Sequence, residues 1–82
     1  MAKLLIVDDE SDVREFAANF FRKCKITCFT AASGEEALAL LEKDKPDLVL
    51  LDIKMEGIDG IETLKRIKEN DKNLKVIMAS CR

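Results

Sequence analysis

The sequence of 82 residues contains no histidine and only three cysteines. Without histidine, the odd set of Cys24, Cys28 and Cys81 is a poor ligand set for zinc. We expect three reduced thiols, two of them in or near the core. Long apolar runs are also absent: only four apolar residues follow Lys3, too few for a signal peptide or a membrane span. We therefore expect a cytoplasmic protein without a membrane partner.

A strong charge of either sign is absent as well. The net charge of −2 gives no attraction to nucleic acid, and Lys65, Arg66 and Lys68 fit the solvated side of a helix. Hydrophobic residues make up 48% and charged residues 37%, which is typical of a soluble folded protein. At this length we expect a single domain over residues 1–82, with a small margin of stability and incompletely covered apolar surface.

Short apolar runs alternate with amphipathic segments along the chain. Runs at 3–7, 26–30, 48–51 and 74–79 predict strands. Helical spacing predicts helices from 11 to about 24, from 34 onward after the N-cap Ser33, and from 61 to just before 70. Pro46 cannot continue the second helix. The apolar positions of the first helix are Val13, Phe16, Ala17, Phe20, Phe21 and Cys24.

This βαβαβαβ order predicts a parallel sheet with helices on both faces. In open sheets of this kind, ligands bind beyond the carboxyl ends of the strands, where the strand order reverses. If the first strand lies between the second and the third, this point falls between strands one and three. Asp8 and Asp9 follow the first strand, Asp52 follows the third, and Ser80 follows the fourth. We expect these four side chains to converge.

Three clustered carboxylates predict a site for a hard cation. Two unit charges about 4 Å apart repel by roughly 4 kcal/mol at an effective dielectric constant near 20, so the cluster must share a proton, admit water or hold a cation. A ligand set of oxygens alone favours Mg²⁺. The residues therefore suggest metal-assisted phosphoryl chemistry with one carboxylate as the nucleophile. The alternative is that these acids are merely solvated strand ends.

Several separated segments together resemble the receiver domain of bacterial response regulators. They are Leu5–Glu10, Ala32–Leu38, Pro46–Met55, Ile58–Gly60 and Val76–Ser80. The resemblance covers essentially the whole chain. It implies an α/β, flavodoxin-like (CheY-like) parallel sheet with strand order 2-1-3-4, lacking the family's last helix, strand and helix.

The resemblance also implies a role for each site residue. Asp52 would accept a phosphoryl group from a sensor histidine kinase or a phosphotransfer protein, which makes the chain a regulatory phosphoacceptor rather than a conventional enzyme. Asp9 would bind Mg²⁺ directly and Asp8 largely through water, with the main-chain carbonyl of Lys54 as a further ligand. Ser80 matches the switch hydroxyl that turns toward the phosphoryl group. The Lys54 side chain either influences hydrolysis or is simply solvated.

Two features depart from the family pattern. Glu56 stands where the family commonly has proline, which loosens the loop and adds negative charge beside the acids. The sequence also has no counterpart of the elements that follow Ser80 in the family, among them a lysine that pairs with the phosphoryl group. We therefore expect impaired transfer to Asp52, and homo-oligomers formed through the fourth-strand edge or the bare sheet face.

Two other functions fit part of the pattern. Phosphatases of the haloacid dehalogenase type also place a nucleophilic aspartate at a strand end beside Mg²⁺, but in an Asp-x-Asp motif. Here Lys54 stands two residues after Asp52, which argues against that family. The stronger alternative is a non-catalytic, receiver-derived fragment or assembly module that self-associates.

Overall fold

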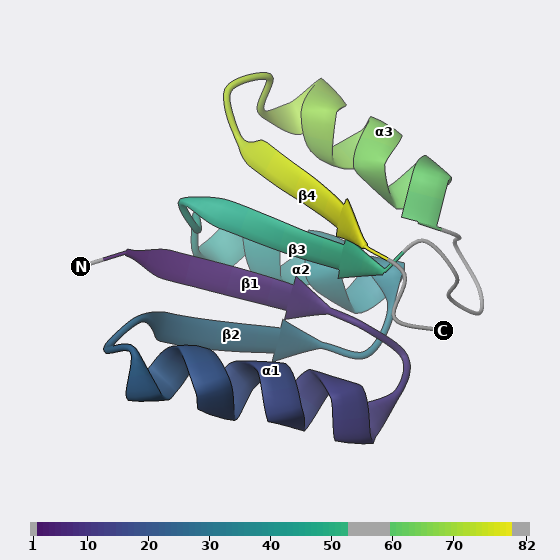
Figure 1. The fold of residues 1–82 in the computed structure, drawn as a ribbon. Coiled ribbons are helices and arrows are strands. Elements are labelled where there is room, and N and C mark those ends of the chain that lie inside the picture. Colours follow the sequence, from purple (N-terminus) through teal and green to yellow (C-terminus); the bar gives the residue numbers. More distant parts are fainter. Residues whose placement is uncertain (1, 53–59, 80–82) are drawn as a thin grey trace.

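The computed structural model describes residues 2–52 and 60–79, which form a four-stranded parallel sheet between helices (Figure 1). The strand order is β2-β1-β3-β4, and all neighbouring strands are parallel. The predicted fold and strand order are confirmed, with strand ends within one residue of expectation. The elements are β1 (Lys3–Val7), α1 (Ser11–Lys23), β2 (Thr27–Ala31), α2 (Gly34–Lys43), β3 (Leu48–Asp52), α3 (Gly60–Asn70) and β4 (Lys75–Ala79).

Helices α2 and α3 cover one face of the sheet. Because side chains alternate along a strand, every second residue of β1 and β3 points to this face. Those side chains are closed off from water: Leu5 and Val7 are 1% exposed, and Val49 and Leu51 are 0% exposed. Ile67 of α3 packs into the same cluster. This face holds the main core and supplies most of the apolar burial. We call it the covered face.

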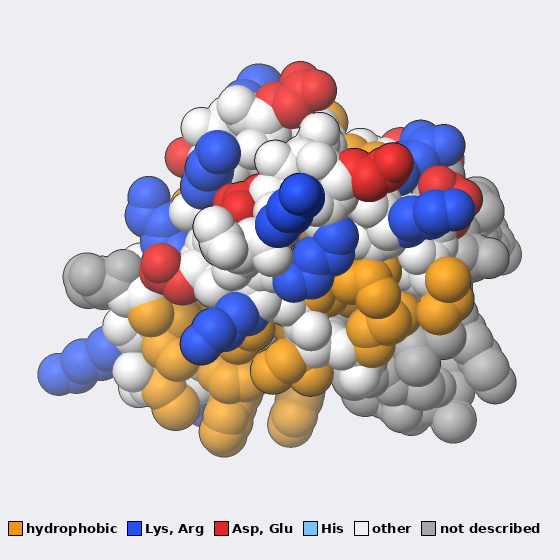
Figure 2. All heavy atoms as spheres, turned by 90° about the horizontal axis from the view of Figure 1, so that it is seen from above, with side chains coloured by type: hydrophobic (Ala, Val, Ile, Leu, Met, Phe, Trp, Pro, Cys, Tyr) orange, Lys and Arg blue, Asp and Glu red, His pale blue; other side chains and the backbone are white. Residues whose placement is uncertain are grey.

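Within residues 2–52 and 60–79, the opposite face carries one helix, α1, which packs against β2 and β1 (Figure 1). Leu4 and Ile6 of β1 are buried in the cluster that α1 covers. Farther along the sheet, Leu48 and Leu50 are only partly buried, and Ile77 of β4 is 51% exposed. These three side chains help to line an apolar groove of about 150 Å³. Figure 2 shows hydrophobic side chains gathered in the lower part of the view, on the side where α1 lies. We call this the open face.

Helix α1 is amphipathic, but the apolar positions over residues 11–24 are not all buried. Phe16 is 75% exposed, Phe20 is 55% exposed, and Cys24 is also exposed. Of the two described cysteines, only Cys28 is buried; Cys81 lies outside the described residues. Burial raises the pKa of the Cys28 thiol, and the nearby charge of Arg22 acts in the opposite direction.

The rotation of α1 about its axis explains this difference. Ala18 is 1% exposed, and its small side chain lets the helix lie close to the sheet. Two arginines hold this orientation by donating to main-chain oxygens of the sheet side: Arg14 Nη1 to Asp8 at 2.8 Å and Arg22 Nη2 to Cys28 at 3.4 Å. Phe16 and Phe20 consequently lie on another flank of the helix, whereas Phe21 packs against the cluster beneath it. No helix in the described part of the chain is long and apolar enough to cross a membrane.

Candidate functional site

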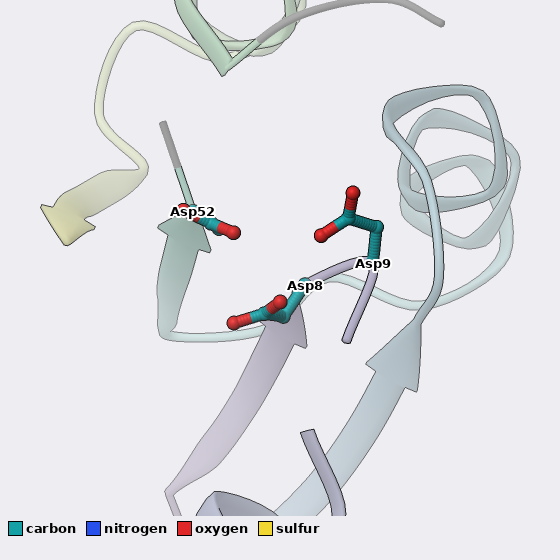
Figure 3. Close-up of side chains that lie close together, drawn as sticks. All are labelled: Asp8, Asp9 and Asp52. Carbon is teal, nitrogen blue, oxygen red and sulfur yellow. The ribbon is translucent and has the colours of Figure 1, made fainter. Parts of the chain in front are cut away.

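Three carboxylates converge where β1 and β3 end (Figure 3). Asp8, Asp9 and Asp52 each offer one oxygen, and these atoms all lie within 4.8 Å of one another. The sheet register explains the arrangement, because Val7 is aligned with Leu51 and the next residue of each chain segment is an aspartate. Asp8 and Asp52 are buried, at 6% and 4% exposure, whereas Asp9 is partly exposed.

Asp8 is held by its main chain and by its side chain. Its amide donates to the main-chain oxygen of Ala31 in β2 at 3.1 Å. Its Oδ1 accepts a hydrogen bond of 2.9 Å from the amide of Glu10, and its main-chain oxygen accepts the bond from Arg14. The end of β1 is therefore tied to β2, to the following turn and to α1. Asp52 is positioned differently, as the last residue of β3, paired in register with Ala79 of β4.

The cluster has the chemistry of a magnesium site. At separations of 4.8 Å or less, each pair of ionised carboxylates repels by at least about 3.5 kcal/mol at an effective dielectric constant near 20. Behind the acids lies an apolar cavity of about 50 Å³ between α1, β1 and β3, which offers no compensating charge. Oxygens on one Mg²⁺ lie about 3 to 4 Å apart, so small side-chain rotations would bring all three acids onto one ion. The donor set fits the ion.

The other predicted site residues lie outside the described part of the chain. They are Lys54, whose main-chain carbonyl is a predicted metal ligand, and Ser80, the predicted switch hydroxyl. Glu56, the departure from the family pattern, also lies there. Sequence reasoning missed two contacts at the site. The bond from the Glu10 amide follows the Asx-turn spacing and could have been predicted, whereas no local pattern indicates the Arg14 bond.

Comparison with known proteins decides the family. The model of the response regulator receiver domain matches residues 4–82. The chain belongs to this family. Sporulation initiation phosphotransferase F of Bacillus subtilis is 49% identical over 76 residues, which are 93% of this chain and 61% of that protein. A heme response regulator HssR of Staphylococcus aureus is 39% identical over 82 residues, 100% of this chain and 36% of that protein. The receiver chain thus spans less than two thirds of either relative.

Solved receiver structures have the same architecture. The N-terminal domain of a response regulator receiver protein from Methanoculleus marisnigri superposes with a TM-score of 0.95 at 38% identity, covering 100% of this chain and 68% of that chain. The response regulator TrrA of Thermotoga maritima, in complex with Mg²⁺–BeF, gives a TM-score of 0.94 at 36% identity, covering 100% and 71%. The predicted resemblance is confirmed: this is a receiver domain sequence of the two-component response regulators.

Proposed function

We propose that this receiver chain is a regulatory phosphoacceptor whose Asp52 takes a phosphoryl group from a sensor histidine kinase or a phosphotransfer protein. Asp8, Asp9 and Asp52 would hold Mg²⁺, with the main-chain carbonyl of Lys54 as a further ligand. The observation that supports this proposal is the convergence of the three acids at the reversal point of a receiver-type sheet. Clustered, buried carboxylates are typical of sites that bind a cation or carry out a reaction.

The position of Asp52 suits a nucleophile. It ends a central strand, where it is paired in register with Ala79 of β4, and its carboxylate lies close to those of the other two acids. One of its oxygens attacks the phosphorus of a phosphohistidine; the O–P bond forms while the N–P bond breaks, and that electron pair stays on the imidazole nitrogen. Bound Mg²⁺ supplies neutralisation of the charge on the phosphoryl oxygens. The Ser80 hydroxyl would then donate to the phosphorylated Asp52.

Mass spectrometry tests this proposal directly. We expect incubation with acetyl phosphate and Mg²⁺ to add about 80 Da to the chain. Asp52→Asn should abolish the gain, because it replaces the nucleophilic carboxylate with a neutral amide. Asp44→Asn, a change at an exposed acid after α2, should leave the gain intact. An unmodified wild-type chain, or an equal gain in Asp52→Asn, contradicts phosphoryl acceptance at Asp52.

The open face favours a second function, self-association. Leu48, Leu50 and Ile77 leave apolar surface beside the groove, and apolar patches of this kind commonly mark a protein contact. We propose a second copy as the occupant, meeting this face or the edge of β4. If the chain forms dimers but gains no mass with acetyl phosphate, the assembly module is the better description. If the chain gains mass as a monomer, the phosphoacceptor is the better description.

We further propose that residues 1–82 act as one domain in the cytoplasm, without a nucleic acid or membrane partner. The net charge of −2 supports the absence of a nucleic acid partner, because a chain with this charge does not attract a polyanion.

A further inference from the structure

The side chain of Arg14 links α1 to the end of β1. Its Nη1 donates a hydrogen bond of 2.8 Å to the main-chain oxygen of Asp8. The residue lies in the first two turns of α1, and its side chain is only partly exposed. A guanidinium therefore spans the turn that carries the first two acids of the site.

Among the bonds described above that hold Asp8, this one can be removed by a substitution outside the acid cluster. The bonds to Ala31 and from Glu10 involve main-chain groups of the neighbouring strand and of the turn. They remain available whatever side chains are changed in α1. The Arg14 bond depends on one side chain, whose fork geometry holds an acceptor in a fixed direction.

The restraint on Asp8 extends to Asp9. The carbonyl group of Asp8 and the amide of Asp9 share one rigid peptide plane, so fixing the oxygen also fixes the direction in which the chain enters Asp9. Asp9 needs this restraint more than its partners do. It lies in the loop between β1 and α1 and is partly exposed, whereas Asp8 and Asp52 are buried.

We propose that Arg14 is a positioning residue: it holds the turn after β1 so that the Asp9 carboxylate faces Asp8 and Asp52, and it thereby raises the affinity of the cluster for a divalent cation. This inference rests on the proposed function, because it concerns the same metal site. It assigns the effect to geometry rather than to charge.

Charge alone predicts the opposite sign. A guanidinium bonded next to the cluster repels an incoming cation, so its removal would tighten Mg²⁺ binding. Positioning predicts that removal weakens binding, because the acids lose their arrangement before the ion arrives. The direction of the change therefore separates the two effects.

The test is calorimetric titration of the 82-residue chain with MgCl₂. We expect Arg14→Gln, which is neutral and too short to reach the oxygen, to weaken Mg²⁺ binding by about 10-fold. Arg14→Lys keeps the charge and a single donor nitrogen, and its Mg²⁺ affinity should lie between those of the wild type and Arg14→Gln. The matched control is Arg22→Gln, which removes the same kind of bond, also across six residues, at the other end of α1. Its Mg²⁺ affinity should equal that of the wild type.

Each outcome decides the matter. Unchanged or tighter binding by Arg14→Gln overturns the proposal, and so does an equal loss in Arg22→Gln, which would indicate general loosening of α1. Circular dichroism without Mg²⁺ checks that each variant is folded. If Arg14→Gln does not fold, Arg14→Lys carries the test, and wild-type affinity in that variant overturns the proposal. A wild-type chain that binds no Mg²⁺ overturns the metal site itself, a result distinct from failure of the Arg14 effect alone.

Discussion

The two faces of one sheet differ in how completely helices cover them. On the covered face, α2 and α3 exclude water from Val49 and Leu51; on the open face, α1 leaves Leu48 and Leu50 partly buried and Ile77 half exposed. Neighbouring residues of β3 thus have the same chemistry and different surroundings. The stabilising apolar burial is therefore concentrated on the covered face, while the open face is available for contacts with another chain. The three acids lie at the edge that both faces share.

The sharpest test of this comparison is a pair of adjacent substitutions in β3. We expect Leu51→Ala to cost about 3–4 kcal/mol of unfolding free energy, because it leaves a cavity in the covered face. Leu50→Ala, on the open face, should cost about 1 kcal/mol, since its side chain is already partly in water. Urea denaturation followed by circular dichroism measures both values. Equal costs would show that the two faces are packed alike in solution.

A smaller effect is expected on self-association. Ile77→Lys places a charge on the open face, and we expect it to shift the chain toward monomer, because a buried unpaired charge opposes contact between copies. Ile61→Lys is the matched control: Ile61 is 59% exposed on α3, away from the open face. Light scattering at low micromolar concentration measures the molar mass. A wild-type chain that is already a folded monomer contradicts self-association, and a dimer in Ile77→Lys excludes this face as the contact.

The smallest effect concerns the part of the open face that α1 does close. Cys28 is buried there and Cys24 is exposed, so we expect iodoacetamide to modify Cys24 at least about 10-fold faster in a Cys81→Ser background. Burial raises the pKa of Cys28 above 9.0, so the folded state retains this proton more tightly than the unfolded state. That contribution to stability is therefore complete below pH 9 and is lost as the pH rises through the raised value. Peptide mapping measures the two rates; equal rates would show that α1 opens readily.

Much of the fold was predictable because strand and helix signals were local. The apolar runs placed every strand to within a residue, and Ser33 accepts the predicted bond from the Glu36 amide at 3.1 Å. The Glu36 carboxylate in turn accepts a hydrogen bond of 3.3 Å from the amide of Ala32, one residue before this N-cap. The exposure of Phe16 could not be predicted from local signals. Helical periodicity identifies apolar positions, but which of them are buried depends on how much sheet lies beneath each flank.

At the candidate site, too, some features follow from local sequence signals and others depend on tertiary packing. Convergence of the acids follows from strand ends and topology, which the sequence carries in apolar runs followed by aspartate. The contribution of Arg14 was not predictable, because an arginine between apolar positions of a helix is ordinarily solvated. Only the rotation of α1 brings its side chain to the oxygen of Asp8.

The bond from Arg22 to Cys28 bears on how large an assembly can grow. The amide of Thr27 donates to the main-chain oxygen of Ala2, and the main-chain oxygen of Ala31 accepts from the amide of Asp8. The main-chain groups of these two β2 residues therefore point toward β1. Because the direction alternates along a parallel strand, those of Cys28 point away from the sheet. An arginine side chain thus occupies an outward-facing acceptor on one border of the sheet. If copies join through β4, this obstruction hinders a third copy from adding at β2. Strand pairing would then end at a closed two-fold pair instead of extending into a fibre.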